Sequence, residues 1–141
     1  MHSRKAFTIV ETTAVIAVMA ALTAITLPRA AGFIDRIEVR GAVAEIESMF
    51  SLARHAAIAR GARVTLEIDP SASTISVHAA NGLLRSREIG AAHGVSLSAN
   101  RTTITYSPIG VGYGAANASL IVSRGRVVDT VVISRLGRVR H

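Results

Sequence analysis

The stretch RKAFTIVETTAVIAVMAALTAITLP, residues 4–28, decides the first half of the fold. Residues 7–27 form a run of 21 residues with one ionisable side chain, Glu11, and the cations Arg4 and Lys5 precede the run. At ~1.5 Å per residue, a helix of this length is ~32 Å long and can cross the apolar core of a bilayer. The sequence therefore predicts a transmembrane helix over residues 7–28, with its basic end in the cytoplasm and the remainder of the chain translocated.

Glu11 is an unusual residue for such a helix, because a carboxylate in an apolar environment costs about 3 kcal/mol on insertion scales. Hydropathy alone leaves two interpretations open. Glu11 lies at a frayed, interfacial helix end and still reaches water, or it has a dedicated partner inside or beside the membrane. Pro28 closes the uncharged run, and it predicts a perturbed or kinked helix at that point rather than necessarily its end.

The composition suits one compact domain and a membrane segment, because the chain has 141 residues. It contains no cysteine, which excludes disulfides, a thiol nucleophile and a thiolate metal site. The net charge is +7, from 15 arginines and one lysine against 9 acidic residues. The use of arginine in place of lysine has two explanations, codon composition or contact with phosphate or carboxylate groups, which guanidinium binds through two hydrogen bonds.

After residue 28 an amphipathic helix is expected as far as Arg60 and Gly61, a cation followed by a glycine stop. Its apolar stripe, at spacings of three and four, consists of Val39, Val43, Ile46, Phe50, Ala53 and Ala57. The period then changes to two, and strands are expected near residues 64–68, 75–77, 83–89, 95–97, 103–106, 119–122 and 127–134. Turns are expected at Asn81–Gly82 and at SRGR, residues 123–126, and no further helix is expected. The predicted fold class is α+β, with a long N-terminal helix packed on antiparallel sheets.

The N-terminal residues resemble those of type IV pilin-like proteins, through RKAFTIVET, the uncharged run and Pro28. The resemblance implies a leader over residues 1–6, which prepilin peptidase removes between Ala6 and Phe7 before the new amine is methylated. The family usually has glycine where this chain has Ala6. Glu11 is then the fifth residue of the mature chain, where the family glutamate pairs with a terminal amine of its own or a neighbouring subunit. Such a cationic partner makes a buried carboxylate tolerable.

The rest of the chain resembles the minor pseudopilins of the GspH and FimT types. The resemblance rests on the absence of cysteine, on YSPIGVGYG at residues 106–114 and on VVISRLGRVR at residues 131–140. It implies a pilin-like fold and a subunit at or near the tip of a type II secretion pseudopilus, or a subunit of a type IV pilus. Some FimT-type members contribute to DNA uptake through a Gly-Arg-x-Arg motif, which here is Gly137–Arg140.

The C-terminal segment is the most basic part of the sequence. Residues 124–141 contain one acid, Asp129, and five arginines, Arg124, Arg126, Arg135, Arg138 and Arg140. In an extended chain, Arg138 and Arg140 lie on one face, ~6.5–7 Å apart. Such a patch suits a DNA phosphate backbone without sequence specificity. A solvated rim, or pairing with acidic neighbours in a filament, explains the same charges.

Two functions therefore stay open, a structural filament subunit and a pilus-associated DNA receptor. No enzymatic activity and no cofactor are expected, because the histidines are scattered and no serine lies in a nucleophile motif. The expected partners are prepilin peptidase, other pilins, the inner membrane and, in the second function, DNA. The expected organisation is a leader (1–6), a transmembrane or filament-core helix (7–28), an amphipathic helix half (29–61) and a β-rich periplasmic domain (62–141).

Overall fold

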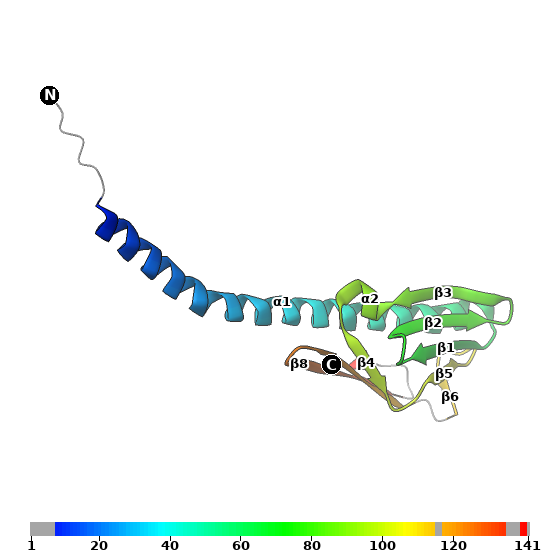
Figure 1. Cartoon of the computed structure of the whole chain (residues 1–141). Coiled ribbons are helices and arrows are strands. Elements are labelled where there is room, and N and C mark those ends of the chain that lie inside the picture. Colours follow the sequence, from blue (N-terminus) through cyan, green and yellow to red (C-terminus); the bar gives the residue numbers. More distant parts are fainter. Residues whose placement is uncertain (1–7, 115–116, 135–138, 141) are drawn as a thin grey trace. The chain divides into compact units, whose positions relative to one another are not determined.

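The computed structural model describes residues 8–114, 117–134 and 139–140, without the side chains of residues 26–31 and 139. The chain divides into two compact units, Met1–Ile34 and Asp35–His141. The long helix α1 (Ile9–Arg60, 52 residues) contributes to both units (Figure 1). The helix continues through Pro28, so the proline does not end it.

Two antiparallel sheets make up most of the second unit. One has the strand order β3-β2-β1-β5-β6 and the other the order β4-β7-β8-β9. A short helix, α2 (Ile89–His93), connects β3 of the first sheet to β4 of the second. The strands are β1 (Val64–Asp69), β2 (Thr74–Ala79), β3 (Gly82–Glu88), β4 (Ser96–Ala99), β5 (Thr103–Tyr106), β6 (Gly112–Tyr113), β7 (Ala118–Arg124), β8 (Val127–Ile133) and β9 (Val139–Arg140).

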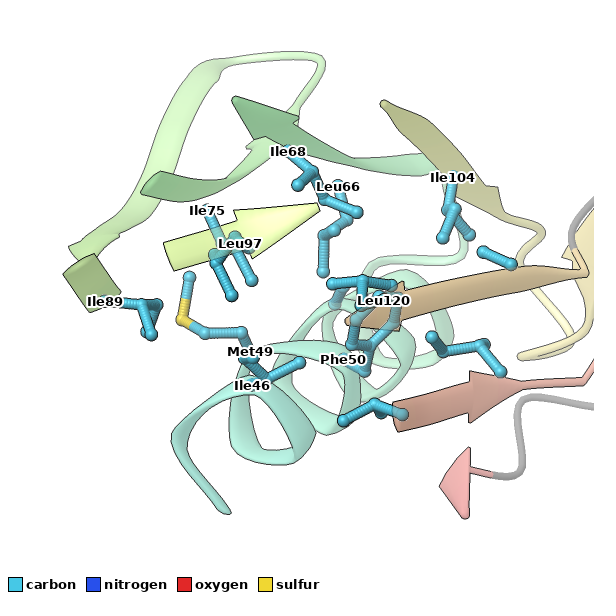
Figure 2. Packing of buried hydrophobic residues seen from close by; sticks show 14 of the residues in the cluster. Ile46, Met49, Phe50, Leu66, Ile68, Ile75, Ile89, Leu97, Ile104 and Leu120 are labelled. Atoms are coloured by element: carbon cyan, nitrogen blue, oxygen red, sulfur yellow. The ribbon is translucent and has the colours of Figure 1, made fainter. Parts of the chain in front are cut away.

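The core of the second unit lies between α1 and the inner faces of both sheets. Figure 2 shows Phe50 of α1 close to Leu66 of β1 and Leu120 of β7. Each of these side chains is at most 1% exposed, and burying one of this size contributes roughly 1.5–3 kcal/mol. The predicted helical stripe is confirmed, since all its members are buried: Val39, Val43, Ile46, Phe50, Ala53 and Ala57.

The predicted end of the helix is also confirmed. Gly61 adopts a left-handed backbone with φ +56°, which glycine adopts without a steric penalty. The Gly61 N–H donates to the Ile58 carbonyl (3.2 Å), and the Ala62 N–H donates to the Ala57 carbonyl (3.3 Å). This pair of hydrogen bonds is a Schellman motif, and it satisfies carbonyls that the last helical turn leaves without partners.

The free edge of the first sheet carries charge on its inner side. Arg85 and Arg87 of the edge strand β3 lie opposite Val77 and Ile75 of β2. Residues directly opposite in an antiparallel pair point to the same face, and both β2 residues are fully buried. The two arginines therefore lie on the core-facing side of the edge, where Arg87 Nε contacts Glu45 Oε1 at 3.2 Å.

Three local predictions are corrected. The expectation of no helix after residue 61 is wrong, because residues 89–93 form α2 where the chain passes from one sheet to the other. Ile89, predicted as the end of a strand, begins this helix and is buried, so its apolar side chain fits either structure.

The β2–β3 turn consists of Ala80 and Asn81, since Gly82 already pairs with Ala79. The short strands β6 and β9 were not predicted, and two-residue strands leave no period to recognise.

Candidate assembly interface

The first unit presents an apolar helical surface. Every described side chain of residues 8–25 is exposed. The large apolar side chains among them are between 55% and 82% exposed, and they include Ile9, Val10, Val15, Ile16, Val18, Met19 and Ile25. A continuous apolar surface of this kind is typical of a site that lipid or another protein covers.

The threonines of this helix do not interrupt its apolar character. The hydroxyl of Thr12 donates to the Ile9 carbonyl at 2.9 Å, and that of Thr23 donates to the Met19 carbonyl at 2.7 Å. Thr13 makes the same kind of bond to Val10, also at 2.9 Å. A hydroxyl that bonds back to its own helix needs no water, so these residues fit an apolar environment.

Glu11 lies in the first turn of α1, and its backbone N–H donates to the Thr8 hydroxyl at 3.2 Å. Thr8 precedes the first helical residue, so the two residues have the Ser/Thr-x-x-Glu spacing of a capping box. A carboxylate in the first turn also interacts favourably with the helix dipole. The spacing of Thr8 and Glu11 is therefore a second local signal in the sequence, in addition to the charge of Glu11 in an apolar run.

Other predicted features of the N-terminus are not described by the structure. Ala6, Phe7 and the side chain of Pro28 lie outside the described residues. The predicted cleavage position and the pairing of Glu11 with a terminal amine stay predictions. Among the described residues, no helical segment combines the length and the mean hydropathy that crossing a membrane requires.

The basic residues near the C-terminus do not form one cluster among the described residues. Arg126 lies in the predicted SRGR hairpin, next to Val127 at the start of β8, whereas Arg140 of β9 lies opposite Val132. Five residues of strand correspond to ~17 Å, so β8 separates the two arginines. Arg135 and Arg138 lie outside the described residues.

Arg124 is engaged within the second unit. Its Nε donates to Asp35 Oδ1 at 3.0 Å, and its Nη1 donates to the His93 carbonyl. The Arg124 side chain is 30% exposed and the Asp35 side chain 26%. Withdrawing this guanidinium to bind a ligand would leave a half-buried carboxylate without its partner, so Arg124 is a poor candidate for DNA contact.

A serine, a histidine and a glutamate lie close together in the first sheet: Ser76, His78 and Glu67. The Ser76 hydroxyl is 3.0 Å from His78 Nε2, and Glu67 Oε2 is 3.6 Å from the same nitrogen. A catalytic triad needs the acid on the other ring nitrogen, so that it orients the imidazole toward the nucleophile. These three residues therefore lack triad geometry, and no group of three His, Asp or Glu side chains among the described residues is placed to hold a metal.

Comparison with solved structures identifies the fold. The crystal structure of the type IV minor pilin FimU from Pseudomonas aeruginosa matches with a TM-score of 0.63 and 18% identity. The match covers 77% of this chain and 90% of that chain. A second crystal form of FimU matches with a TM-score of 0.58 and 15% identity, over 72% of this chain and 90% of the other. The predicted pilin-like α+β fold is confirmed.

Comparison of the sequence identifies the family. A search of curated proteins finds no significant match. The family model of the type II transport protein GspH matches residues 42–137, which is more than half of the chain. The matched region contains most of the helical stripe, α2 and the strands β1 to β8. The chain therefore belongs to the GspH family and has the fold of a minor pilin.

Proposed function

We propose that this chain is a minor pilin-like subunit that assembles into, or caps, a periplasmic filament of a type II secretion or type IV pilus machine. The observation that carries the proposal is the exposed apolar helix of residues 8–25 in a chain of the GspH family. Such a helix is stable in a filament when neighbouring helices cover it, and in the inner membrane before assembly when lipid covers it.

The proposal includes a maturation step. Prepilin peptidase removes residues 1–6, and the amine created on Phe7 becomes the cationic partner of Glu11 in its own or the next subunit. A carboxylate that leaves water is stabilised by such a charge-assisted contact. Intact mass measurement of the protein purified from cells with the peptidase tests this step. Loss of residues 1–6 and gain of one methyl group are expected, and an uncut N-terminus in assembled filaments would contradict it.

Assembly is tested by photo-crosslinking of the full chain in cells that contain its filament machine. A photoreactive amino acid at Val15 is expected to capture other pilin-like subunits, because Val15 is 56% exposed on the apolar helix. The same group at Leu83, which is 59% exposed in the second unit, is the matched control. Glu11→Gln is expected to lower the Val15 yield at least severalfold. Capture of lipid alone from Val15 in assembled filaments would refute the proposed interface.

A second candidate function is binding of DNA, supported by the net charge of +7 and by the concentration of arginines near the C-terminus. Binding of the full chain to duplex DNA is measured over a salt series. If Arg138 and Arg140 contact phosphates, changing both to glutamine lowers the slope of log K against log salt by up to ~2. The control is Arg85→Gln/Arg101→Gln, which removes the same charge from other exposed positions. Equal effects of the two pairs would exclude a specific role for the C-terminal motif.

A further inference from the structure

His93, the last residue of α2, lies between two carboxylates of α1. Its Nδ1 is 3.1 Å from Glu38 Oε2, and its Nε2 is 3.1 Å from Glu45 Oε2. The two glutamates are seven residues apart, which places them two turns apart on one face of the helix. All three side chains are partly shielded from water, with exposures of 21% for His93, 34% for Glu38 and 26% for Glu45.

The backbone of α1 provides the space that the imidazole ring occupies. Gly41 lies between the two glutamates in sequence, and a Cβ at this position would approach His93 Cε1 to 3.0 Å and Nδ1 to 3.2 Å. Such distances are tighter than ordinary van der Waals contact. The glycine therefore lets the ring lie directly against the helix, with a carboxylate at each nitrogen.

This geometry is satisfied by only one form of the histidine. A neutral imidazole has one N–H donor and one lone pair, whereas an imidazolium has two donors. An ionised carboxylate only accepts hydrogen bonds. If His93 is neutral, one glutamate faces a nitrogen lone pair at 3.1 Å, and that contact is repulsive. If His93 is protonated, both contacts are charge-assisted hydrogen bonds.

The surrounding charges favour the same form. Glu45 also contacts Arg87 of β3 through its other oxygen, at 3.2 Å. Arg124 of β7 donates to the His93 carbonyl and to Asp35 of α1. This cluster consists of three carboxylates on α1 and two guanidiniums on the sheets. The imidazolium of His93 supplies the third positive charge, and the cluster is then electrically neutral.

We infer that His93 is a protonation-dependent latch, which fastens the part of α1 containing Asp35, Glu38 and Glu45 to α2 and to both sheets. α2 connects the two sheets, so the latch acts at the point where helix and sheets meet. Only the protonated ring donates to both glutamates, and only the folded domain holds the two carboxylates at its nitrogens. Both hydrogen bonds are therefore present at mildly acidic pH, and one of them is lost when the ring becomes neutral at higher pH.

The experiment measures the melting temperature of the full chain in detergent micelles between pH 5.5 and pH 8. The wild-type melting temperature is expected to fall by about 4–8 °C over this range. His93→Gln is expected to remove at least half of that fall. The matched control is His78→Gln, because His78 lies near one carboxylate only and its side chain is 38% exposed. The control is expected to keep the wild-type pH dependence.

An equal pH dependence in the wild type and His93→Gln would overturn the latch. Nitrogen-15 NMR of the wild-type ring gives a second readout that does not depend on the variant folding. At pH 6 both ring nitrogens of His93 are expected to have the chemical shifts of an imidazolium. A neutral tautomer at that pH would also overturn the inference. Gly41→Ala is expected to reduce the pH dependence, because it displaces the ring from between the glutamates.

Discussion

Asp69 closes the β1–β2 hairpin with its own carboxylate. The Ser71 hydroxyl donates to Oδ1 at 2.5 Å, and the N–H groups of Ser71 and Ala72 donate to it at 2.9 Å and 3.2 Å. The hydrogen bond from the Ser71 hydroxyl is the largest of the influences that hold the pKa of the Asp69 carboxyl below its ordinary value, and desolvation acts in the opposite direction. The pKa of this carboxyl is lower in the folded protein than in the unfolded chain, so the ionised carboxylate stabilises the fold at pH values above the unfolded pKa. This stabilisation is lost as the pH falls through the folded pKa.

Asp69→Asn is therefore expected to flatten the acid end of the stability curve. The amide oxygen still accepts the turn hydrogen bonds but has no charge. The melting temperature is therefore expected to be somewhat lower than that of the wild type at pH 7, and the loss between pH 5 and pH 2.5 becomes smaller. Thermal unfolding over this range measures the effect. Glu67→Gln is the control, since it removes a carboxylate from the same strand without touching the turn. A D69N curve parallel to that of the wild type would disprove the linkage.

Gly110 combines a left-handed backbone with a close approach to α1. Its φ is +75°, and a Cβ there would lie 2.6 Å from Ile58 Cδ1. Gly110→Ala is expected to lower the free energy of unfolding by roughly 2–4 kcal/mol, since backbone strain and overpacking add. Gly114→Ala is the control, with φ +71° and no described atom within 4 Å, and about 1–2 kcal/mol is expected. Denaturant unfolding compares them, and equal losses would rule out the contact with Ile58.

At the scale of the element, α1 owes its place in the second unit to one face. Phe50 is 1% exposed, and Phe50→Ala is expected to cost about 3–5 kcal/mol of unfolding free energy. Phe50→Leu is the milder variant if the first does not fold, with an expected loss of roughly 1–1.5 kcal/mol. Ser51→Ala, on the exposed face one residue later, is expected to change stability by less than about 0.5 kcal/mol. Similar losses for Phe50→Leu and Ser51→Ala would contradict the packing.

The elements differ in how well the sequence predicts them. The helical stripe from Val39 to Ala57 and the helix end at Gly61 follow local rules of spacing and conformation. The sequence alone therefore predicts them. The pairing of β1 with β5 and of β4 with β7 joins segments far apart in sequence, and no local pattern specifies it. The sequence does not predict α2, because its five residues are too few to show helical periodicity.

The candidate sites show the same limit. The Glu11 region was recognised from a short motif and a run of apolar residues, which are local. The contact of Arg124 with Asp35 spans 89 positions, and the contacts of His93 with the glutamates span 55 and 48. The sequence therefore shows Arg124 as part of a basic tail, whereas in the structure it pairs with Asp35. His93 is isolated in the sequence, but in the structure it lies between two carboxylates.

At the scale of the whole molecule, the buried core belongs to the second unit alone. Its members all lie between Val39 and Ile133 among the described residues. A chain beginning at Asp35 is therefore expected to be monomeric without detergent, and to melt within about 4 °C of the full chain. Circular dichroism and size-exclusion chromatography measure both properties. A chain beginning at Ala44 loses Val39, Ala42 and Val43 and is expected to melt well below both. Equal melting of the two shorter chains would contradict this division.

The arginines on the inner side of β3 have a consequence for how copies of this protein associate. An unpaired sheet edge can add a strand from another copy, and such additions lead to aggregates rich in cross-strand hydrogen bonds. A strand from another copy that paired with β3 would cover Arg85 and Arg87 and desolvate their guanidinium groups. This desolvation makes the pairing less favourable. β3 thus resists uncontrolled growth of the sheet from this edge. Under the proposed function, this protection keeps association through the sheet edge from competing with association through the apolar helix.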